Sequence, residues 1–146
     1  MRYFGWLFLL LWSCGGSGNQ AEGENAIRFR QYMVQGQQLY LQHCSNCHQA
    51  EGTGLAQLYP PLAHADYMLE DVGRTVCLIK YGLAGEIIVN GKDYNLPMPA
   101  NQQLTDIEIA EIATYIYNAW GNQHGLISVT EVTQMLKTCD RNVHQK

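Results

Sequence analysis

The sequence of 146 residues has little charge and lacks several patterns that would identify a function directly. Its 9 lysines and arginines form no run, and with 13 aspartates and glutamates they give a formal net charge of −4. A nucleic-acid-binding protein needs a basic patch, so nucleic acid is not an expected partner. No apolar run reaches the roughly 20 residues that cross a bilayer as a helix. We also find no glycine-rich phosphate loop, no nucleophile paired with a base, and no internal repeat.

The first 13 residues are predicted to be an export signal. Arg2 provides a short positive start, and residues 3–12 are apolar, which is typical of a signal peptide. The segment Leu11-Trp12-Ser13-Cys14 resembles the lipobox of bacterial lipoproteins, although its tryptophan is bulky for that motif. Cys14 would then be the first mature residue and would carry the lipid; the alternative is that Cys14 is removed with the signal. Residues 14–26, which are rich in glycine, are predicted to be a flexible tether.

The pentapeptide Cys44-Ser45-Asn46-Cys47-His48 is the most specific feature of the chain. C-x-x-C-H is the attachment signature of a c-type haem, in which two thiols bond to the vinyl groups on one porphyrin edge and the histidine binds iron. A thioredoxin-like pair would follow a strand, whereas a helical pattern precedes Cys44. A structural zinc site needs a second ligand pair, which is absent from the sequence. We therefore expect one covalent haem c, attached through Cys44 and Cys47, with His48 as the proximal iron ligand.

Helical periodicity and one hairpin signal organise the residues around this motif. Apolar residues recur every three or four positions from Ile27 to His43, and Gly36 in that helix predicts the close approach of another backbone. Short helices are expected over residues 66–71 and 74–81. The Asn90-Gly91 dipeptide lies between two strand-like runs, which predicts a β-hairpin with a type I′ turn.

Two capping boxes mark the last two expected helices. Thr105 and Glu108 form the first box, and the helix that it opens is predicted to stop at Gly121. Ser128 and Glu131 form the second box, which opens a short helix before a frayed tail. The predicted fold class is therefore all-α, with one short hairpin.

Taken together, these residues resemble a small class I cytochrome c, a His/Met monohaem electron carrier, over about residues 31–121. The shared features occur in the family's order: C-x-x-C-H, a proline–leucine pair, a methionine beside proline, and a closing amphipathic helix. The resemblance implies that Gly36 and Tyr40 cross the last family helix near Tyr117 and Trp120. It also implies that the carbonyl of Pro60 accepts the Nδ1–H of His48, a bond that orients a ligating ring. The hairpin and the terminal helix depart from the family. The chain also has no mid-domain tryptophan, a residue that serves a haem propionate in many members; Tyr67, Arg74, Tyr81 and Tyr94 stay open as substitutes.

Met98, between Pro97 and Pro99, is the predicted sixth iron ligand. A thioether is a neutral donor, and His/Met ligation raises the potential of a haem. Met68 and His64 are the alternatives, and His64 would give a bis-His haem of low potential. Six apolar residues are expected to box the ring and leave one edge open: Leu55, Leu58, Leu62, Leu78, Ile79 and Leu96.

Cys77 and Cys139 are left over when the haem motif and the lipobox take three of the five cysteines. Disulfides persist in exported proteins, so this pair is predicted to form one and to hold the terminal helix in place. The alternative is two separate buried thiols, because free cysteine packs as a small apolar residue.

The expected organisation is a signal peptide (1–13), a tether (14–26), a cytochrome c domain (27–121) and a helical extension with a tail (122–146). In line with the resemblance, we expect a monomeric, lipid-anchored carrier of single electrons outside the cytoplasmic membrane, on the periplasmic side. Its partners would be redox proteins such as a quinol-oxidising complex or a terminal oxidase. We expect no enzymatic activity, because six ligands leave iron no open position. Two alternatives remain: a fixed haem subunit of a respiratory complex, and a haem enzyme or gas sensor with a displaceable methionine.

Overall fold

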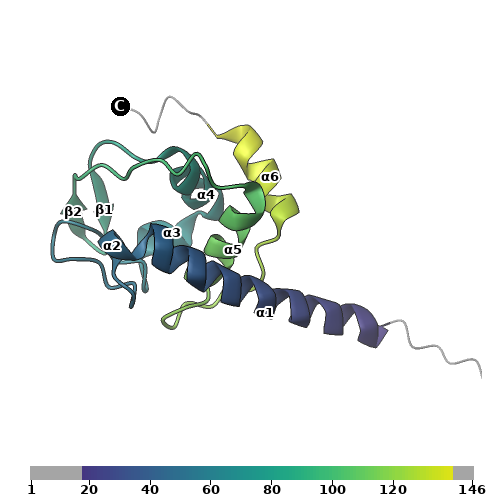
Figure 1. Cartoon of the computed structure of the whole chain (residues 1–146). Coiled ribbons are helices and arrows are strands. Elements are labelled where there is room, and N and C mark those ends of the chain that lie inside the picture. Colours follow the sequence, from purple (N-terminus) through teal and green to yellow (C-terminus); the bar gives the residue numbers. More distant parts are fainter. Residues whose placement is uncertain (1–17, 140–146) are drawn as a thin grey trace, which may run out of the picture.

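The structure, a computed structural model, describes residues 18–139, with side chains from Glu22 onward. These residues form six helices and one two-stranded antiparallel hairpin (Figure 1). The helices are α1 (Gly18–His43), α2 (Ser45–His48), α3 (Asp66–Glu70), α4 (Val72–Tyr81), α5 (Asp106–Ile116) and α6 (Val129–Thr138), and the strands are β1 (Ile87–Val89) and β2 (Lys92–Tyr94). The predicted all-α class, with a short hairpin and an extra terminal helix, is confirmed. None of the helices in this part of the chain is both long and apolar enough to cross a membrane.

The crossing of α1 over α5 is the main packing contact of the fold. Gly36 of α1 lies against the backbone of α5, where an added Cβ would sit 2.0 Å from the carbonyl oxygen of Glu111. One turn further on, the ring of Tyr40 packs against those of Tyr115 and Trp120, with ring centroids 5.5 and 5.1 Å away. The absent side chain at position 36 therefore lets the two helices meet closely, just before α1 delivers the chain to Cys44.

Tyr117 does not lie where the resemblance placed it at this crossing, because its side chain points toward α3 and α4. Its hydroxyl donates to the carbonyl oxygen of Met68 and lies 3.0 Å from the hydroxyl of Thr75. The residues that meet Gly36 are Glu111 and Tyr115, which precede Tyr117 by six and two residues. Tyr117 instead ties the end of α5 to α3 and α4.

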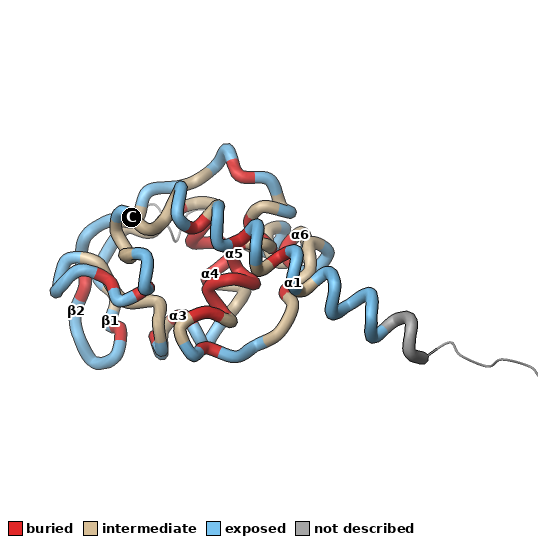
Figure 2. Tube along the Cα trace, turned by 60° about the horizontal axis from the view of Figure 1, so that its bottom comes forward, coloured by how far each residue is buried: buried red, intermediate tan, exposed pale blue. Residues whose placement is uncertain are grey.

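The first helix begins earlier than the sequence predicted. Residues 18–26 belong to α1, although they fall within the segment expected to be a flexible tether. The glycines that suggested a tether are interspersed with alanine, glutamate and glutamine, which are strong helix formers, and a long helix continues directly from them. Figure 2 shows residues 22–28 of α1 as exposed, whereas α4 and α5 are largely buried.

The helix α5 ends at Ile116, earlier than the predicted stop at Gly121. Two side-chain amides take carbonyl groups that would otherwise continue the helix. Asn118 Nδ2 donates to the carbonyl oxygens of Thr114 and Gly125, and Asn122 Nδ2 donates to that of Ile116. The chain then turns toward α6.

The helix α6 is held against α4 and α5 by packing and by a disulfide. Its capping box is formed by Ser128 and Glu131, and Val132 is fully buried. Cys139, directly after the helix, is bonded to Cys77 of α4, with the two Cα atoms 5.7 Å apart. The extension is thereby connected to the helix that also carries Leu78 and Ile79.

The hairpin is fastened to the start of α3. Asn90 and Gly91 both have positive φ, as a type I′ turn requires. The backbone N–H of Asn90 donates to Asp66 Oδ1 over 2.7 Å, and Asn90 Oδ1 accepts from the backbone N–H of Asp66 over 3.0 Å. This reciprocal pair of hydrogen bonds fixes where the two strands lie relative to the helices.

Candidate cofactor site

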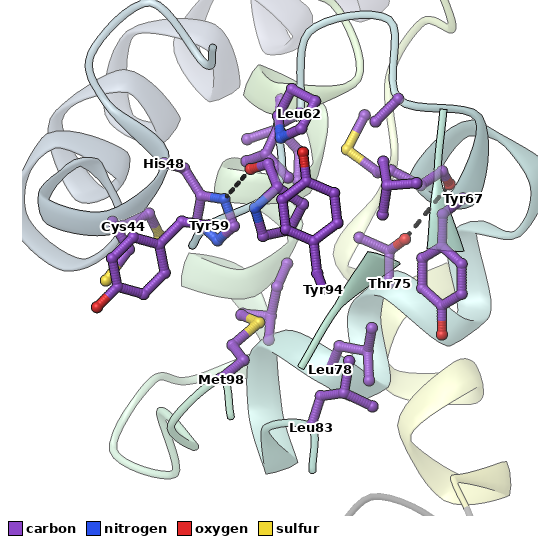
Figure 3. A pocket seen from close by; sticks show the side chains of 18 of the residues that line it. Cys44, His48, Tyr59, Leu62, Tyr67, Thr75, Leu78, Leu83, Tyr94 and Met98 are labelled. Atoms are coloured by element: carbon purple, nitrogen blue, oxygen red, sulfur yellow. Dashed lines mark hydrogen bonds between the residues drawn. The ribbon is translucent and has the colours of Figure 1, made fainter. Parts of the chain in front are cut away.

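One deep pocket lies between the haem motif, the Tyr59–Leu62 segment, α4, the hairpin and the loop around Met98 (Figure 3). Its wall is mostly apolar, and it brings together residues from most of the chain. Cys44, Cys47, His48 and Met98 all line it. The residues singled out at positions 44 to 48 and at position 98, some 50 residues apart, therefore meet at one site.

The motif begins where α1 ends and keeps a helical course. The N–H of Cys44 donates to the carbonyl oxygen of Tyr40 over 2.8 Å, and that of His48 donates to the carbonyl oxygen of Cys44 over 3.0 Å. Cys44 and Cys47 are free thiols, both half-buried. Burial, together with the nearby Cys47, raises the pKa of Cys44 to about 12. Both thiols therefore line the pocket, and that of Cys44 is protonated at neutral pH.

The ring of His48 is oriented by a backbone carbonyl. Nδ1 lies 2.9 Å from the carbonyl oxygen of Pro60, as the resemblance implies. Because a carbonyl can only accept, Nδ1 carries the proton, and the lone pair of Nε2 is left free for a metal. Burial lowers the pKa of His48, which favours this neutral ring. Gly54 makes the contact possible, because an added Cβ there would lie 2.3 Å from the carbonyl oxygen of Tyr59.

The backbone of Met98 forms two reciprocal hydrogen bonds with that of Leu83. The N–H of Met98 donates to the carbonyl oxygen of Leu83 over 2.8 Å, and the reverse bond measures 2.9 Å. Gly82 supports this pairing with a positive φ, and an added Cβ would sit 2.5 Å from the carbonyl oxygen of Met98. Figure 3 shows the thioether of Met98 and the imidazole of His48 reaching into the pocket from opposite sides.

Four of the six expected box residues line the pocket: Leu62, Leu78, Ile79 and Leu96. Leu55 and Leu58 do not, and are 45% and 51% exposed. The backbone bridge between Leu55 and Tyr59 closes a tight loop, and the side chains of both leucines lie on its outer surface. The prediction that these two leucines contact the ring is therefore not supported by the geometry.

The alternative iron ligands differ in where they lie. Met68 is buried on the pocket wall. His64 is exposed and is not part of the wall, and its ring rests on Gly121. His43 is half-buried and also lines the pocket. Met33 and Met135 pack at the margin of the core.

The hairpin lines the pocket with Ile87, Val89 and Tyr94. Tyr94 was among the substitutes considered for a haem propionate, whereas Ile87 and Val89 were not singled out from the sequence. Alternation along the strands could have indicated that these three share a face, but not that the face turns toward the haem motif.

The donors and the wall fit a covalently attached haem. Two free thiols, an imidazole with its Nε2 available and a thioether surround an apolar space, and these are the groups that attach and ligate a c-type haem. Within residues 18–139 no group of three or more His, Cys, Asp or Glu side chains is placed to hold another metal ion. A zinc site is thus unsupported in the described part of the chain.

Comparison with known proteins points the same way. The family model described as cytochrome c matches residues 33–120. A cytochrome c-552 from Thermus thermophilus is 40% identical over 91 residues, which are 60% of this chain and 69% of that protein. A second cytochrome c-552 from the same species is 40% identical, with 61% of its length covered. The cytochrome c subunit of a quinone alcohol dehydrogenase from Gluconobacter oxydans is 28% identical over 107 residues, which are 70% of this chain and 22% of that subunit.

Proposed function

Since the chain belongs to the cytochrome c family, whose cofactor is a covalently attached haem, we propose that it is a carrier of single electrons. Cys44 and Cys47 hold one haem c, and His48 and Met98 are its axial ligands. The observation that supports these roles best is the placement of an oriented imidazole and a thioether on opposite sides of one apolar pocket.

When bound, the haem supplies an Fe(III)/Fe(II) couple that takes up and releases one electron. The protein's part is to hold the ligands in a fixed geometry. Pro60 keeps the Nε2 lone pair of His48 directed into the pocket, because its carbonyl oxygen holds the Nδ1 proton. The backbone pairing of Leu83 with Met98 limits how far the thioether can move. A neutral sulfur ligand and an apolar wall both favour the reduced state.

Two axial ligands from the protein leave no open position for a substrate, and this distinguishes a carrier from a haem enzyme or gas sensor. We expect the oxidised protein to show the far-red charge-transfer band of methionine-bound ferric haem. The band should persist when cyanide or nitric oxide is added in moderate excess. Rapid loss of the band with either ligand, followed by turnover of peroxide, would support the enzyme or sensor instead.

The proposed place of work is outside the cytoplasmic membrane, on the periplasmic side, with a lipid on Cys14 as anchor. The lipobox-like segment 11–14 supports this location. Covalent attachment of haem c also requires that the chain is exported. Stable anchoring takes more than one acyl chain, as a lipoprotein cysteine carries. Labelling with a radioactive fatty acid should mark the wild-type chain and not Cys14→Ser. An unlabelled wild-type chain that is nevertheless exported would show that Cys14 leaves with the signal.

The domain division follows from this proposal, with one boundary changed. Residues 1–13 are the signal, and the cytochrome domain extends to residue 121 before the α6 extension. Residues 18–26 already belong to α1, so the cytochrome domain takes in part of the segment that was predicted to be a tether. A helix rises about 1.5 Å per residue, which makes the 26 residues of α1 roughly 39 Å long. The haem motif therefore follows a helix that extends well beyond the body of the domain.

A second candidate function is that of a fixed subunit in a respiratory complex. The similarity to the cytochrome c subunit of a quinone alcohol dehydrogenase favours it. A monomeric carrier should elute alone after gentle solubilisation and should exchange electrons with both a quinol-oxidising complex and a terminal oxidase. Co-purification with one such complex in a fixed ratio would favour the subunit.

A further inference from the structure

Asn122 is a buried asparagine whose side chain joins the end of α5 to a segment beside the haem motif. Only 4% of the residue is exposed. Its Nδ2 donates to the carbonyl oxygen of Leu62 over 3.1 Å and to that of Ile116 over 2.8 Å. Its Oδ1 accepts from the backbone N–H of His64 over 3.0 Å. The whole amide group is therefore engaged, and Leu62 and Ile116 are both residues of the pocket wall.

Termination of α5 alone does not account for this arrangement. The last carbonyl groups of a helix need donors, and the bond from Asn122 to Ile116 supplies one. The bonds to Leu62 and His64 instead join residues that are 60 and 58 positions apart in the sequence. Asn122 also lies beyond residue 120, where the match to the family model ends. The side chain therefore holds residues 62–64 in place as well as ending the helix.

The segment that Asn122 contacts carries the carbonyl group that orients His48. Nδ1 of His48 lies 2.9 Å from the carbonyl oxygen of Pro60, a hydrogen bond drawn in Figure 3. Pro60 and Pro61 have no backbone N–H, so neither can donate a hydrogen bond that would fix this part of the chain. The position of the Pro60 carbonyl consequently depends on what holds the residues on either side of the two prolines.

The two sides of this proline pair are held by different contacts. On the N-terminal side, the N–H of Leu55 donates to the carbonyl oxygen of Tyr59 over 3.0 Å. On the C-terminal side, the N–H of Leu62 donates to the carbonyl oxygen of Gly52 over 2.8 Å. The carbonyl oxygen of Leu62 accepts from Asn122. Of these three contacts, the bond from Asn122 is the one that ties the segment to the end of α5 instead of to the neighbouring loop.

We propose that Asn122 is a positioning residue for the proximal iron ligand. By holding the chain at positions 62 and 64, it keeps the Pro60 carbonyl within hydrogen-bond distance of His48 Nδ1. That bond increases the donor strength of a ligating imidazole, and a stronger donor favours Fe(III). The inference rests on the proposed function, because it needs His48 to be an iron ligand.

Asn118 provides a matched control. Its Nδ2 donates to the carbonyl oxygens of Thr114 and Gly125 over 2.7 and 2.8 Å, and its Oδ1 accepts from the backbone N–H groups of His124 and Gly125. None of these partners is among the described residues that line the pocket. Alanine at position 118 leaves backbone groups without a partner, which lowers stability. Asn118→Ala should do so without releasing the segment beside His48.

Exchange of the His48 Nδ1 proton with solvent measures the proposed effect. In the haem-loaded ferrous protein, which is diamagnetic, this proton should give an NMR signal of its own. The proton should exchange roughly tenfold faster in Asn122→Ala than in the wild type, because the hydrogen bond that protects it has lost its support. Asn118→Ala should show the wild-type rate. Equal rates in Asn122→Ala and the wild type would overturn the proposal, as would an equal acceleration in both variants.

The midpoint potential gives a second readout. A weaker bond to Nδ1 lowers the donor strength of His48, so the potential of Asn122→Ala should rise. A tenfold change in the preference for Fe(III) over Fe(II) corresponds to about 59 mV for a one-electron couple. The rise should stay below that value, because Asn122 acts through Pro60, and Asn118→Ala should keep the wild-type potential. An unchanged potential in Asn122→Ala would contradict the proposal, and so would a fall, since a fall indicates that water has entered the pocket.

A measurement on the wild-type protein covers the case in which Asn122→Ala does not accumulate. Native-state hydrogen exchange at low denaturant concentration resolves which groups open together. The backbone N–H of His64, which is bonded to Asn122, and the Nδ1 proton of His48 should exchange through one opening with the same denaturant dependence. An Nδ1 proton that stays protected while the His64 N–H exchanges would refute the inference.

Failure of this inference and failure of the proposed function give different results. If no haem is covalently attached to the wild type, or if His48 or Met98 is not an iron ligand, the proposed function fails and this inference fails with it. If the wild type holds a six-coordinate His/Met haem and Asn122→Ala matches it in exchange rate and potential, this inference alone fails.

Discussion

Replacing Gly36 with alanine is expected to force α1 and α5 apart at the contact that precedes the haem motif. The new Cβ would lie 2.0 Å from the carbonyl oxygen of Glu111 and 2.8 Å from Cβ of Tyr115. Cβ atoms essentially never approach another heavy atom closer than 3.0 Å, so the helices must separate locally by about 1 Å (3.0 minus 2.0). The obstacle is backbone, which no rotamer change can move aside.

The size of the effect follows from two opposing contributions. Alanine in a helix interior is favoured over glycine by about 1 kcal/mol, whereas overpacking a close helix contact costs about 1 to 3 kcal/mol. Because both partners at this contact are rigid, the upper part of that range applies, and the free energy of unfolding should fall by about 2 kcal/mol. Gly23 lies in the same helix with nothing within 4 Å of an added Cβ. Gly23→Ala should therefore raise the free energy of unfolding by about 0.5 to 1 kcal/mol.

Guanidinium unfolding of the haem-loaded proteins, followed by far-UV circular dichroism, measures both variants against the wild type. The two alanine variants should differ by about 3 kcal/mol, in opposite directions from the wild type. For a domain of this size the difference corresponds to roughly 10 °C in Tm. If Gly36→Ala were as stable as Gly23→Ala, α1 and α5 could not cross as closely as described.

Three further outcomes are expected. Gly82→Ala should weaken the hold on Met98, since an added Cβ would lie 2.5 Å from that residue's carbonyl oxygen; the far-red band should diminish while the covalent haem remains, and an undiminished band would contradict this. Cys139→Ser removes a disulfide that closes a loop of 62 residues. The free energy of unfolding should therefore fall by up to about 4 kcal/mol, and protease should cleave within α6. Two alkylatable thiols at Cys77 and Cys139 in the unreduced wild type would refute the bond. Hydrogen bonds from the N-cap serine of α6 lower the pKa of Glu131 in the folded protein. The contribution of the ionised carboxylate to the free energy of unfolding is therefore complete above about pH 4.5 and is lost as the pH falls through the folded pKa. In Glu131→Gln the free energy of unfolding should fall less steeply over that pH range.

The parts of the fold that local chemistry decides were predictable from the sequence. The capping boxes at Thr105 and Ser128 mark the first residues of α5 and α6 because hydroxyl and carboxylate satisfy free N–H groups within one turn. The Asn90-Gly91 turn follows equally from local backbone preference. Gly36 also predicted a close approach of two backbones. Which residue of α5 it meets depends on the rotation of α5 about its own axis, which the sequence does not indicate.

The parts that depend on distant residues were not predictable in the same way. The end of α5 is set by amides of Asn118 and Asn122, which take carbonyl groups after the chain has folded back. The outward position of Leu58 results from a backbone bridge around it. Ile87 and Val89 look like ordinary strand residues in the sequence, and only the link between Asp66 and Asn90 fixes the hairpin where these side chains line the pocket. In each case the deciding contact joins segments whose distance in space is absent from the local pattern.

Ligation by His48 and Met98 is the central claim, and a potentiometric titration of Met98→Ala beside the wild type tests it most directly. The buried wall residue Met68 supplies the control variant, Met68→Leu. The haem should stay covalently attached in both variants. The midpoint potential should fall by on the order of 100 mV or more in Met98→Ala, because the axial ligand is a main determinant of haem potential, and should stay near the wild-type value in Met68→Leu. An unchanged potential in Met98→Ala, or the large fall in Met68→Leu instead, would contradict the assignment.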